Sequence, residues 1–181
     1  DDLKQKIQST NAKFLMLSHM RGHLVDMDAL IEITNNAGIK VIEDCAHTMG
    51  ANWNGTPSGR SGVIGCFSTQ TFKHINSGEG GFLITDDVEV MAKATMLSGS
   101  YMLYESHLAG APVEAFENIR YDTPNCSGRM DNLRAAILRP QLADLPIQAE
   151  RWNKRYRALE SGLNQFEDIR LTTRPSKEYF V

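Results

Sequence analysis

The sequence lacks the features of several protein classes. It has three cysteines among 181 residues, Cys45, Cys66 and Cys126, and no C-x-x-C pair. They cannot all pair within the chain, so we expect free thiols and a reducing, cytoplasmic setting. No apolar run reaches the roughly 18 residues of a membrane-spanning helix, and the start of the sequence, Asp1-Asp2-Leu3-Lys4, has no signal-peptide pattern. We therefore expect no membrane contact.

A strong charge of one sign is also missing. The net charge is -3, which gives no electrostatic reason to bind nucleic acid or an anionic membrane. The most basic stretch, residues 151–157, contains Trp152 and Tyr156, and we interpret it as the solvated face of a helix. With 41% hydrophobic and 23% charged residues, the composition is that of a globular protein with a core.

The first third of the chain has the pattern of a strand, a helix and a second strand. Residues 13–19 are a short apolar run, residues 27–37 follow acids that suit a helix start, and Gly38 ends that helix. Residues 41–44 form the next apolar run. A unit of this length predicts two parallel strands joined by a right-handed crossover.

The rest of the chain reads as further strands and helices separated by loops. In chain order we expect an exposed loop at 50–62, strands at 63–68 and 81–85, a helix at 88–97 begun by Asp86-Asp87, a long connection at 99–128 and a helical pattern at 130–163. Pro140 and Pro146 should kink or split that last helix. Residues 166–181 read as the beginning of a further unit.

Three side chains at or after strand ends carry the chemistry. Lys73 follows the 63–68 strand and precedes a glycine-rich turn, Ser68 lies five residues before it, and Asp44 ends an earlier strand. An amine, a hydroxyl and an acid are the groups that pyridoxal 5'-phosphate (PLP) needs as Schiff-base partner, phosphate ligand and partner of the ring nitrogen. The carboxyl ends of parallel strands are where open α/β sheets bind ligands.

Each of these residues also has an ordinary interpretation. Lys73 could be a surface lysine in a turn, Asp44 a helix cap or half of a structural ion pair, and Ser68 an unremarkable strand end. His47 could contact the cofactor ring or its phenolic oxygen, or be a structural histidine, and we expect His74 to serve the architecture of the loop. We assign no metal ligands.

The order and spacing of these segments resemble the sugar aminotransferases of the DegT/DnrJ/EryC1/StrS family, within the aspartate-aminotransferase fold (fold type I). The matching segments are residues 41–47, residues 65–68, Lys73 with residues 77–81, and residues 129–138 followed by Gln141-Leu142. The resemblance covers about residues 10–165, although the chain is about half the usual family length.

The resemblance implies a three-layer α/β/α large domain with a mostly parallel sheet, present here in part, and a long helix leading to a shortened small domain. We place the PLP-binding domain at residues 1–145 and the linking helix with the start of the small domain at 146–181. By resemblance, Lys73 is the Schiff-base lysine that also moves the substrate proton, Asp44 pairs with the pyridinium nitrogen, Ser68 holds the phosphate and His47 lies near the ring.

A fifth position and the assembly also follow from the resemblance. Family members act as homodimers, and many carry an asparagine two residues before Arg129 that reaches the neighbouring subunit's phosphate. Ser127 occupies that place here, and Asn125, two residues earlier, is the candidate for the same role.

The implied function is PLP-dependent transfer of an amino group, from glutamate, to a keto group of a nucleotide-linked deoxysugar. Two alternatives stay open, a PLP-dependent sugar dehydratase and a non-catalytic regulatory relative that binds PLP. In the family's dehydratases a histidine takes the lysine's position, and the presence of Lys73 ranks that alternative lower. A dinucleotide-binding domain is excluded because no G-x-G-x-x-G follows the first strand.

Overall fold

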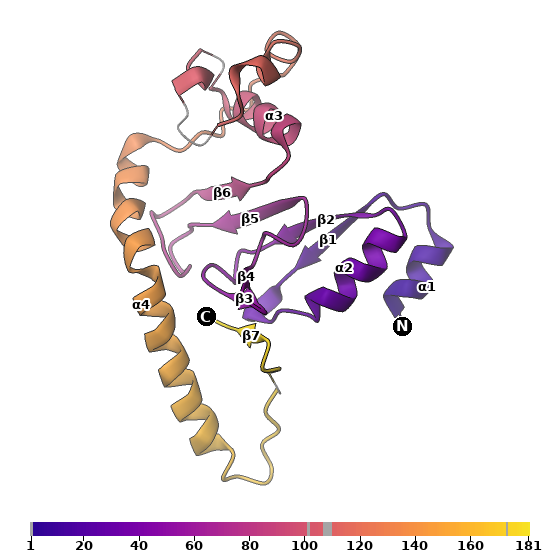
Figure 1. Ribbon diagram of the computed structural model, residues 1–181. Helices are drawn as coiled ribbons and strands as arrows, with labels where there is room; N and C mark the ends of the chain where they lie inside the picture. The colour runs from indigo at the N-terminus through magenta and orange to yellow at the C-terminus, as the bar shows by residue number, and fades with distance from the viewer. Residues whose placement is uncertain (1, 101, 107–109, 173) are drawn as a thin grey trace.

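The computed structural model describes residues 2–100, 102–106, 110–172 and 174–181. Its centre is a four-stranded sheet in the order β1-β2-β5-β6 (Figure 1). The strands β1 (Phe14–Ser18), β2 (Lys40–Asp44) and β5 (Ile64–Ser68) are parallel, and β6 (Gly81–Ile84) is antiparallel to β5. The predicted α/β fold with a mostly parallel sheet is confirmed.

The predicted strand–helix–strand unit is β1, α2 (Met27–Asn36) and β2, preceded by α1 (Asp2–Ser9). The Asp26 carboxylate accepts a hydrogen bond from the backbone N–H of Ala29 at 3.1 Å, which satisfies a free donor at the start of α2. Gly38 follows the helix with a φ of +66°, a conformation that favours glycine. These local signals explain why the sequence predicted this unit well.

The segment at 50–62 was predicted as an exposed loop, and this was wrong for residues 52–57, which form a short hairpin, and for Trp53, which is buried, whereas residues 58–62 are a loop. The strands β3 (Asn52–Trp53) and β4 (Thr56–Pro57) pair with each other, and β3 also pairs with β7 (Glu178–Tyr179). Trp53 is 5% exposed because it packs with Leu24 and Met27. The glycines and asparagines serve a tight turn, while the tryptophan between them belongs to the core.

The helix α3 (Val88–Ser98) begins at Asp87, whose carboxylate accepts from two backbone N–H groups, as predicted. The connection after α3 has more structure than the sequence indicated. It contains two short 3₁₀ helices, η2 (Tyr104–Ser106) and η3 (Val113–Phe116), and Phe116 packs with Met96 of α3 in a separate apolar cluster.

The last helix, α4 (Asn132–Leu163), runs as one element along the sheet (Figure 1). Pro140 and Pro146 were expected to kink or split this helix, and the alternative of a split was wrong. Each proline removes one backbone hydrogen bond, but the carbonyls left without a donor belong to Ala136 and Leu142, which are exposed and can be hydrated. The predicted domain boundary at 145/146 falls within α4 and stays a prediction.

No described helix combines the length and the apolar character needed to cross a bilayer, α4 included.

The two faces of the sheet differ. One face carries Leu17, which packs against the cluster of α2 and the hairpin, and Phe67 and Phe82, which pack against the cluster that contains α4 residues. On the other face Phe14 and Met16 are 59% and 68% exposed, so the described residues leave this face open. Side chains alternate between faces along a strand, so Ser18 and its register partner Asp44 lie on the same open face as Met16.

Candidate functional site

Three polar side chains end three neighbouring parallel strands. Ser18 ends β1, Asp44 ends β2 and Ser68 ends β5. Asp44 is opposite Ser18 on one side and Cys66 on the other. Because Ser68 is two residues beyond Cys66, its side chain lies on the same face of the sheet as Asp44. The structure therefore brings Asp44 and Ser68 to one edge of one face, as the sequence predicted.

Asp44 accepts two hydrogen bonds. The Ser18 hydroxyl donates to Oδ2 at 2.9 Å, and the backbone N–H of Ala46 donates to Oδ1 at 3.1 Å. The chain turns after β2 and forms no helix there, so Asp44 is not a helix cap. Among the described residues it has no ion-pair partner. A half-buried carboxylate without a cation at the carboxyl end of a strand is suited to a positively charged ligand.

Lys73 and His47 meet beside this edge. Lys73 lies in the loop between β5 and β6, and His47 lies in the turn after β2. The Lys73 amine nitrogen Nζ is 3.3 Å from Nε2 of His47. The sequence singled out these two residues separately, and the structure places them in contact. A neutral imidazole next to a lysine can accept its proton, which leaves the amine nucleophilic.

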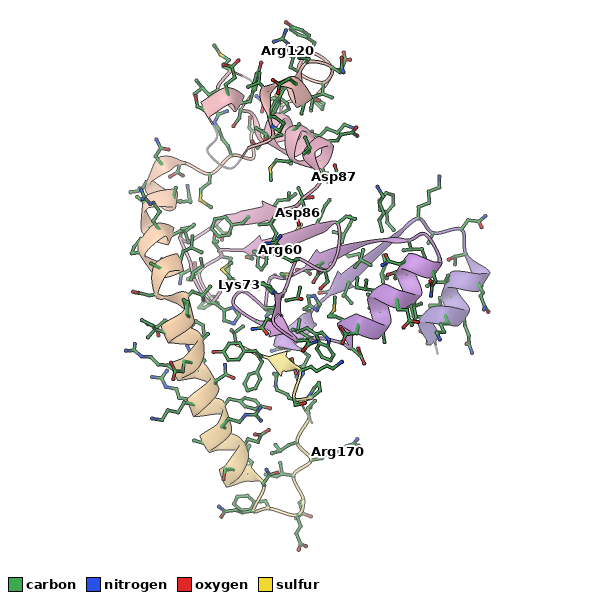
Figure 2. All side chains as sticks on the ribbon, viewed as in Figure 1. Arg60, Lys73, Asp86, Asp87, Arg120 and Arg170 are labelled. Carbon is green, nitrogen blue, oxygen red and sulfur yellow. The ribbon has the colours of Figure 1, made fainter. Side chains whose placement is uncertain are left out.

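Lys73 and His47 open onto a surface depression of about 470 Å³. Figure 2 shows Lys73 between the sheet and α4. The depression is lined by Arg21, His47, Phe72, Lys73, His74, Trp152 and Val181. Sequence reasoning gave no role there to Arg21, Phe72, Trp152 or Val181. Most of these come from segments distant in the sequence, and no motif spacing links them.

The loop that carries Lys73 is fastened to α4. The side-chain amide of Gln141 accepts from the backbone N–H of Asn76 at 2.9 Å and donates to its carbonyl at 2.8 Å. Ile75 is 2% exposed and packs with Leu138 of α4. A loop held by both hydrogen bonds and apolar contacts can present its lysine in one place.

His74 belongs to this support, in agreement with the role predicted for it. Its ring meets Trp152 of α4 edge to face, with the ring centroids 5.2 Å apart. Burial lowers the pKa of His74, and the positive charges of His47 and Lys73 lower it further. The neutral form of His74 is therefore favoured next to the Lys73 amine.

Of the other two predicted residues, Ser68 lies next to the Lys73 loop and Asn125 lies away from it. The Ser68 hydroxyl accepts from the backbone N–H of Gln70 at 3.3 Å, at the start of the Lys73 loop. Asn125 instead lies in the segment after α3, where its side-chain oxygen accepts from the N–H of Ser127 at 2.7 Å. That segment lies beyond β6 in Figure 1, away from Lys73 in Figure 2. A role for Asn125 towards a neighbouring subunit stays a prediction.

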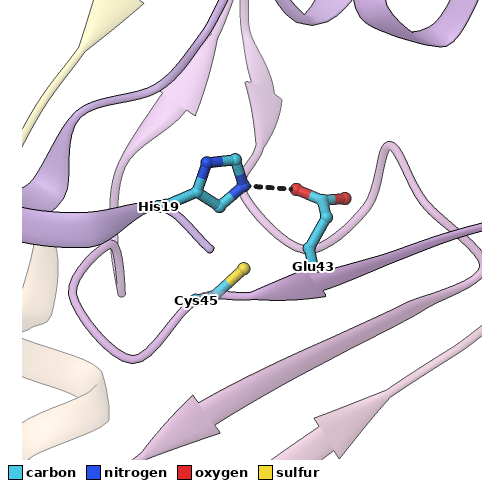
Figure 3. Close-up of side chains that lie close together, drawn as sticks. All are labelled: His19, Glu43 and Cys45. Atoms are coloured by element: carbon cyan, nitrogen blue, oxygen red, sulfur yellow. Dashed lines mark hydrogen bonds and ion pairs between the residues drawn. The ribbon is translucent and has the colours of Figure 1, made fainter. Parts of the chain in front are cut away.

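A buried cluster under the site has a structural explanation (Figure 3). Glu43, His19 and Cys45 offer ligand atoms within 4.8 Å of one another. The Glu43 carboxylate already accepts from Nε2 of His19 at 3.0 Å, and from the backbone N–H groups of Gly59 at 3.0 Å, Ser61 at 2.8 Å and Gly62 at 2.6 Å. These donors occupy the oxygens that a cation would need.

The protonation states of Cys45 and Glu43 also indicate a structural cluster rather than a metal site. Burial raises the pKa of the Cys45 thiol to about 12, with the Glu43 charge adding to the rise, so Cys45 is a protonated thiol and a poor metal ligand. Burial also raises the pKa of Glu43, but the hydrogen bonds from His19, Gly62 and Gly59 outweigh it and leave that pKa below its ordinary value. Glu43 is thus a buried carboxylate that joins β2 to the 59–62 loop.

Comparison with known proteins shows that the chain is similar in sequence to curated aminotransferases. It is 34% identical to L-glutamine:scyllo-inosose aminotransferase of Streptomyces griseus over 155 residues, covering 85% of this chain and 35% of that protein. It is 31% identical to dTDP-3-amino-3,4,6-trideoxy-alpha-D-glucose transaminase of Streptomyces venezuelae over 160 residues, covering 87% of this chain and 37% of that protein. The chain therefore spans about a third of the length of these curated relatives.

Solved structures show the same likeness. AtS13 from Actinomadura melliaura has a TM-score of 0.78 and 28% identity, covering 99% of this chain and 48% of that one. S. venezuelae DesV in complex with a ketimine intermediate has a TM-score of 0.72 and 27% identity, covering 98% of this chain and 45% of that one.

The profile of one family matches residues 1–180. This match spans both the strand-end residues and the loop that carries Lys73, and it confirms the family predicted from the sequence. The chain belongs to the DegT/DnrJ/EryC1/StrS aminotransferase family.

Proposed function

We propose that the protein containing this chain is a PLP-dependent aminotransferase in which Lys73 forms the Schiff base with the cofactor. The observation that carries the proposal is the contact of 3.3 Å between the Lys73 amine and His47, three residues after Asp44. The turn after β2 therefore carries both Asp44, the candidate partner of the ring nitrogen, and His47, which contacts the candidate nucleophile Lys73.

The residues present fit PLP by their chemistry. Asp44 supplies a carboxylate without a cationic partner in the described part of the chain, on the open face of the sheet. Ser68 supplies a hydroxyl on the same face, and Lys73 supplies a primary amine in the adjoining loop. When bound, PLP supplies an aldehyde for the amine and an electron-accepting ring for the substrate carbon.

Each residue then has a defined task. With PLP bound, Asp44 would pair with the ring nitrogen and Ser68 would bind the phosphate, while the Ser18 hydroxyl fixes the orientation of Asp44. Lys73 would carry a proton to and from the substrate carbon, and His47, at 3.3 Å from the Lys73 amine, would accept the proton that leaves the Lys73 ammonium group.

The substrates are proposed from the relatives. Two of the relatives are named for amino transfer that concerns an inosose and a dTDP-linked sugar, and the name of the first includes L-glutamine. We therefore propose an amino-acid donor, glutamate or glutamine, and a keto group of a nucleotide-linked deoxysugar as acceptor. We propose a cytoplasmic location because Cys45, Cys66 and Cys126 are free thiols. From the family resemblance we also propose a homodimer in which Asn125 reaches the partner's cofactor.

The test is the half-reaction with the amino donor. The protein is incubated with PLP and then with L-glutamate, and the visible absorbance of the cofactor is followed. We expect a band from bound PLP that L-glutamate converts to that of the aminated cofactor. The Lys73→Ala variant should lose this conversion, whereas Lys154→Ala, which removes an exposed lysine of α4, should keep it.

The outcome also separates the two alternatives. Binding of PLP without conversion by either L-glutamate or L-glutamine would favour a non-catalytic relative. Sugar turnover that needs no amino donor would favour a dehydratase. Absence of any bound PLP in the intact protein would contradict the proposal as a whole.

A further inference from the structure

We infer that Arg21 binds the α-carboxylate of the amino-acid donor, and so sets which donors the protein accepts. The inference rests on the proposed function, because it names the group that orients the donor beside Lys73. Arg21 lies in the turn after β1, in the short 3₁₀ helix η1 (Met20–Gly22), and lines the same depression as Lys73 and His47.

The depression has an uncompensated basic character. Its lining includes two side chains that carry a full positive charge, Arg21 and Lys73, together with the imidazoles of His47 and His74, and no described acidic side chain. Arg21 is exposed, and within the described ranges its guanidinium has no hydrogen-bond or ion-pair partner. A concave surface of this kind attracts an anion.

The backbone of Arg21 adds an independent observation. Its φ of 59° and ψ of 23° place it in the left-handed region, which non-glycine residues seldom adopt. A glycine would fit this conformation without strain, so an arginine at this position destabilises the backbone. Such strain at the rim of a basic depression indicates a side chain kept for its chemistry.

The turn holds this conformation from two sides. The His19 side chain is buried against Glu43 at 3.0 Å. The Arg174 guanidinium donates to the Gly22 carbonyl at 3.2 Å. Because His19 and Gly22 are buried in the same turn, the Arg21 side chain projects from a rigid turn rather than from a free loop.

The class of ligand follows from the reaction. Every amino-acid donor brings an α-carboxylate next to the amine that must reach the cofactor at Lys73. A guanidinium matches the two oxygens of a carboxylate in a bidentate arrangement, which fixes orientation as well as position. Arg21 is the arginine that lines this depression, so it is the residue that meets the donor's carboxylate.

The test compares two probes that differ only in the α-carboxylate. L-glutamate and its α-amide, isoglutamine, are each titrated in the PLP half-reaction with the wild-type protein and Arg21→Gln. We expect the half-saturating concentration of L-glutamate to rise about 10- to 100-fold in Arg21→Gln, the effect of losing one charged hydrogen-bonding partner. For isoglutamine the two proteins should agree within about twofold, because the group that Arg21 binds is absent.

Two further variants separate binding from folding. Arg21→Gly relieves the left-handed backbone, so its melting temperature should be unchanged or higher while its half-saturation for L-glutamate rises. The control Asn54→Gly makes the same type of change at another left-handed position, in the hairpin turn with a native φ of 49°, where asparagine is less strained than arginine, and it should leave donor binding unchanged. Arg170→Gln removes an exposed arginine that lies far from Lys73 in Figure 2, and it should also leave donor binding unchanged.

The outcomes are distinguishable. A half-reaction in the wild type with equal half-saturation in Arg21→Gln would overturn this inference and leave the proposed function standing. An equal rise for L-glutamate and isoglutamine, or a fall in melting temperature for Arg21→Gly, would also overturn it by showing a merely structural role. No half-reaction in the wild type would contradict the inference and the proposed function together.

Discussion

Glu43 and Asp44 are consecutive acids on one strand, and they have opposite surroundings. Glu43 is 1% exposed and accepts four hydrogen bonds, three of them from the backbone of the 59–62 loop. Asp44 is half-buried and accepts two, and its side chain lies on the open face of the sheet. The alternation of side chains along a strand separates them.

The difference shows how one strand serves both folding and chemistry. Glu43 has its donors supplied by the protein, so it stabilises the fold and has no capacity left for a ligand. Asp44 has a fixed orientation but no cation, so it can still bind one. A substitution at the first position should therefore change stability, and one at the second should change activity.

The largest expected effect is on Glu43. Glu43→Ala leaves three backbone N–H groups and His19 without their acceptor, and should lower the free energy of unfolding by about 3–5 kcal/mol. Urea unfolding measures the loss, with Glu167→Ala, at an exposed position, as control. A loss below about 1 kcal/mol would show that the buried carboxylate is dispensable.

Next in size is Asp44→Asn, which keeps an oxygen to accept from Ala46 but removes the charge. The half-reaction should slow about 100-fold, equivalent to about 3 kcal/mol, while the free energy of unfolding changes by less than about 1 kcal/mol. Asp86→Asn, whose partner Arg60 is exposed (Figure 2), serves as the control. Equal losses of stability at Asp44 and Glu43 would remove the contrast between them.

The pH dependence of stability should report Glu43. Its folded pKa lies below the ordinary value of 4.5, so its contribution is present above that value and is lost as the pH falls through the lower folded pKa. In this acid window the unfolded state binds more protons, and stability rises with pH. Unfolding measured across the window should show a shallower slope, by up to about one proton, in Glu43→Gln. Identical slopes in the two proteins would contradict the assignment.

The smallest expected effect is at Ser18. Ser18→Ala removes the hydroxyl that donates to Asp44 at 2.9 Å, so Asp44 loses part of its orientation but keeps its charge. PLP affinity should fall about fivefold, equivalent to about 1 kcal/mol. Ser98→Ala removes a comparable hydroxyl bond on α3, to the Thr95 carbonyl, and should leave PLP affinity unchanged. If PLP affinity fell as much in Ser18→Ala as in Asp44→Asn, the orientation of the Asp44 carboxylate would matter as much as its charge.

The sequence predicted the parts of this arrangement that depend on local pattern. Asp44 and Ser68 end apolar runs, and parallel pairing brings such ends together, so their placement on one edge could be foreseen. The α2 start at Asp26 and its end at Gly38 are likewise local signals. Lys73 was singled out from its position between a strand and a glycine-rich turn, and its role as the Schiff-base lysine stays a prediction.

Other parts depend on contacts between distant segments. Trp53 lies among turn residues, and only its packing against Leu24 and Met27 shows that the segment is a buried hairpin. Arg21 and Trp152 reach the depression from segments more than one hundred residues apart in the sequence, and no spacing rule joins them. Pro140 indicates a kink or a break by the local rule, yet α4 continues through it, because the carbonyl left without a donor, that of Ala136, is exposed and can be hydrated.

The central claim is that the Lys73 amine, and no other, forms the covalent bond with the cofactor. The direct measurement is reduction of the PLP-loaded protein with borohydride, followed by proteolysis and mass spectrometry of the labelled peptide. The account predicts one pyridoxyl group, on the peptide that contains Lys73 and on no other. A label on a different lysine, or no label in a protein that has taken up PLP, would contradict it.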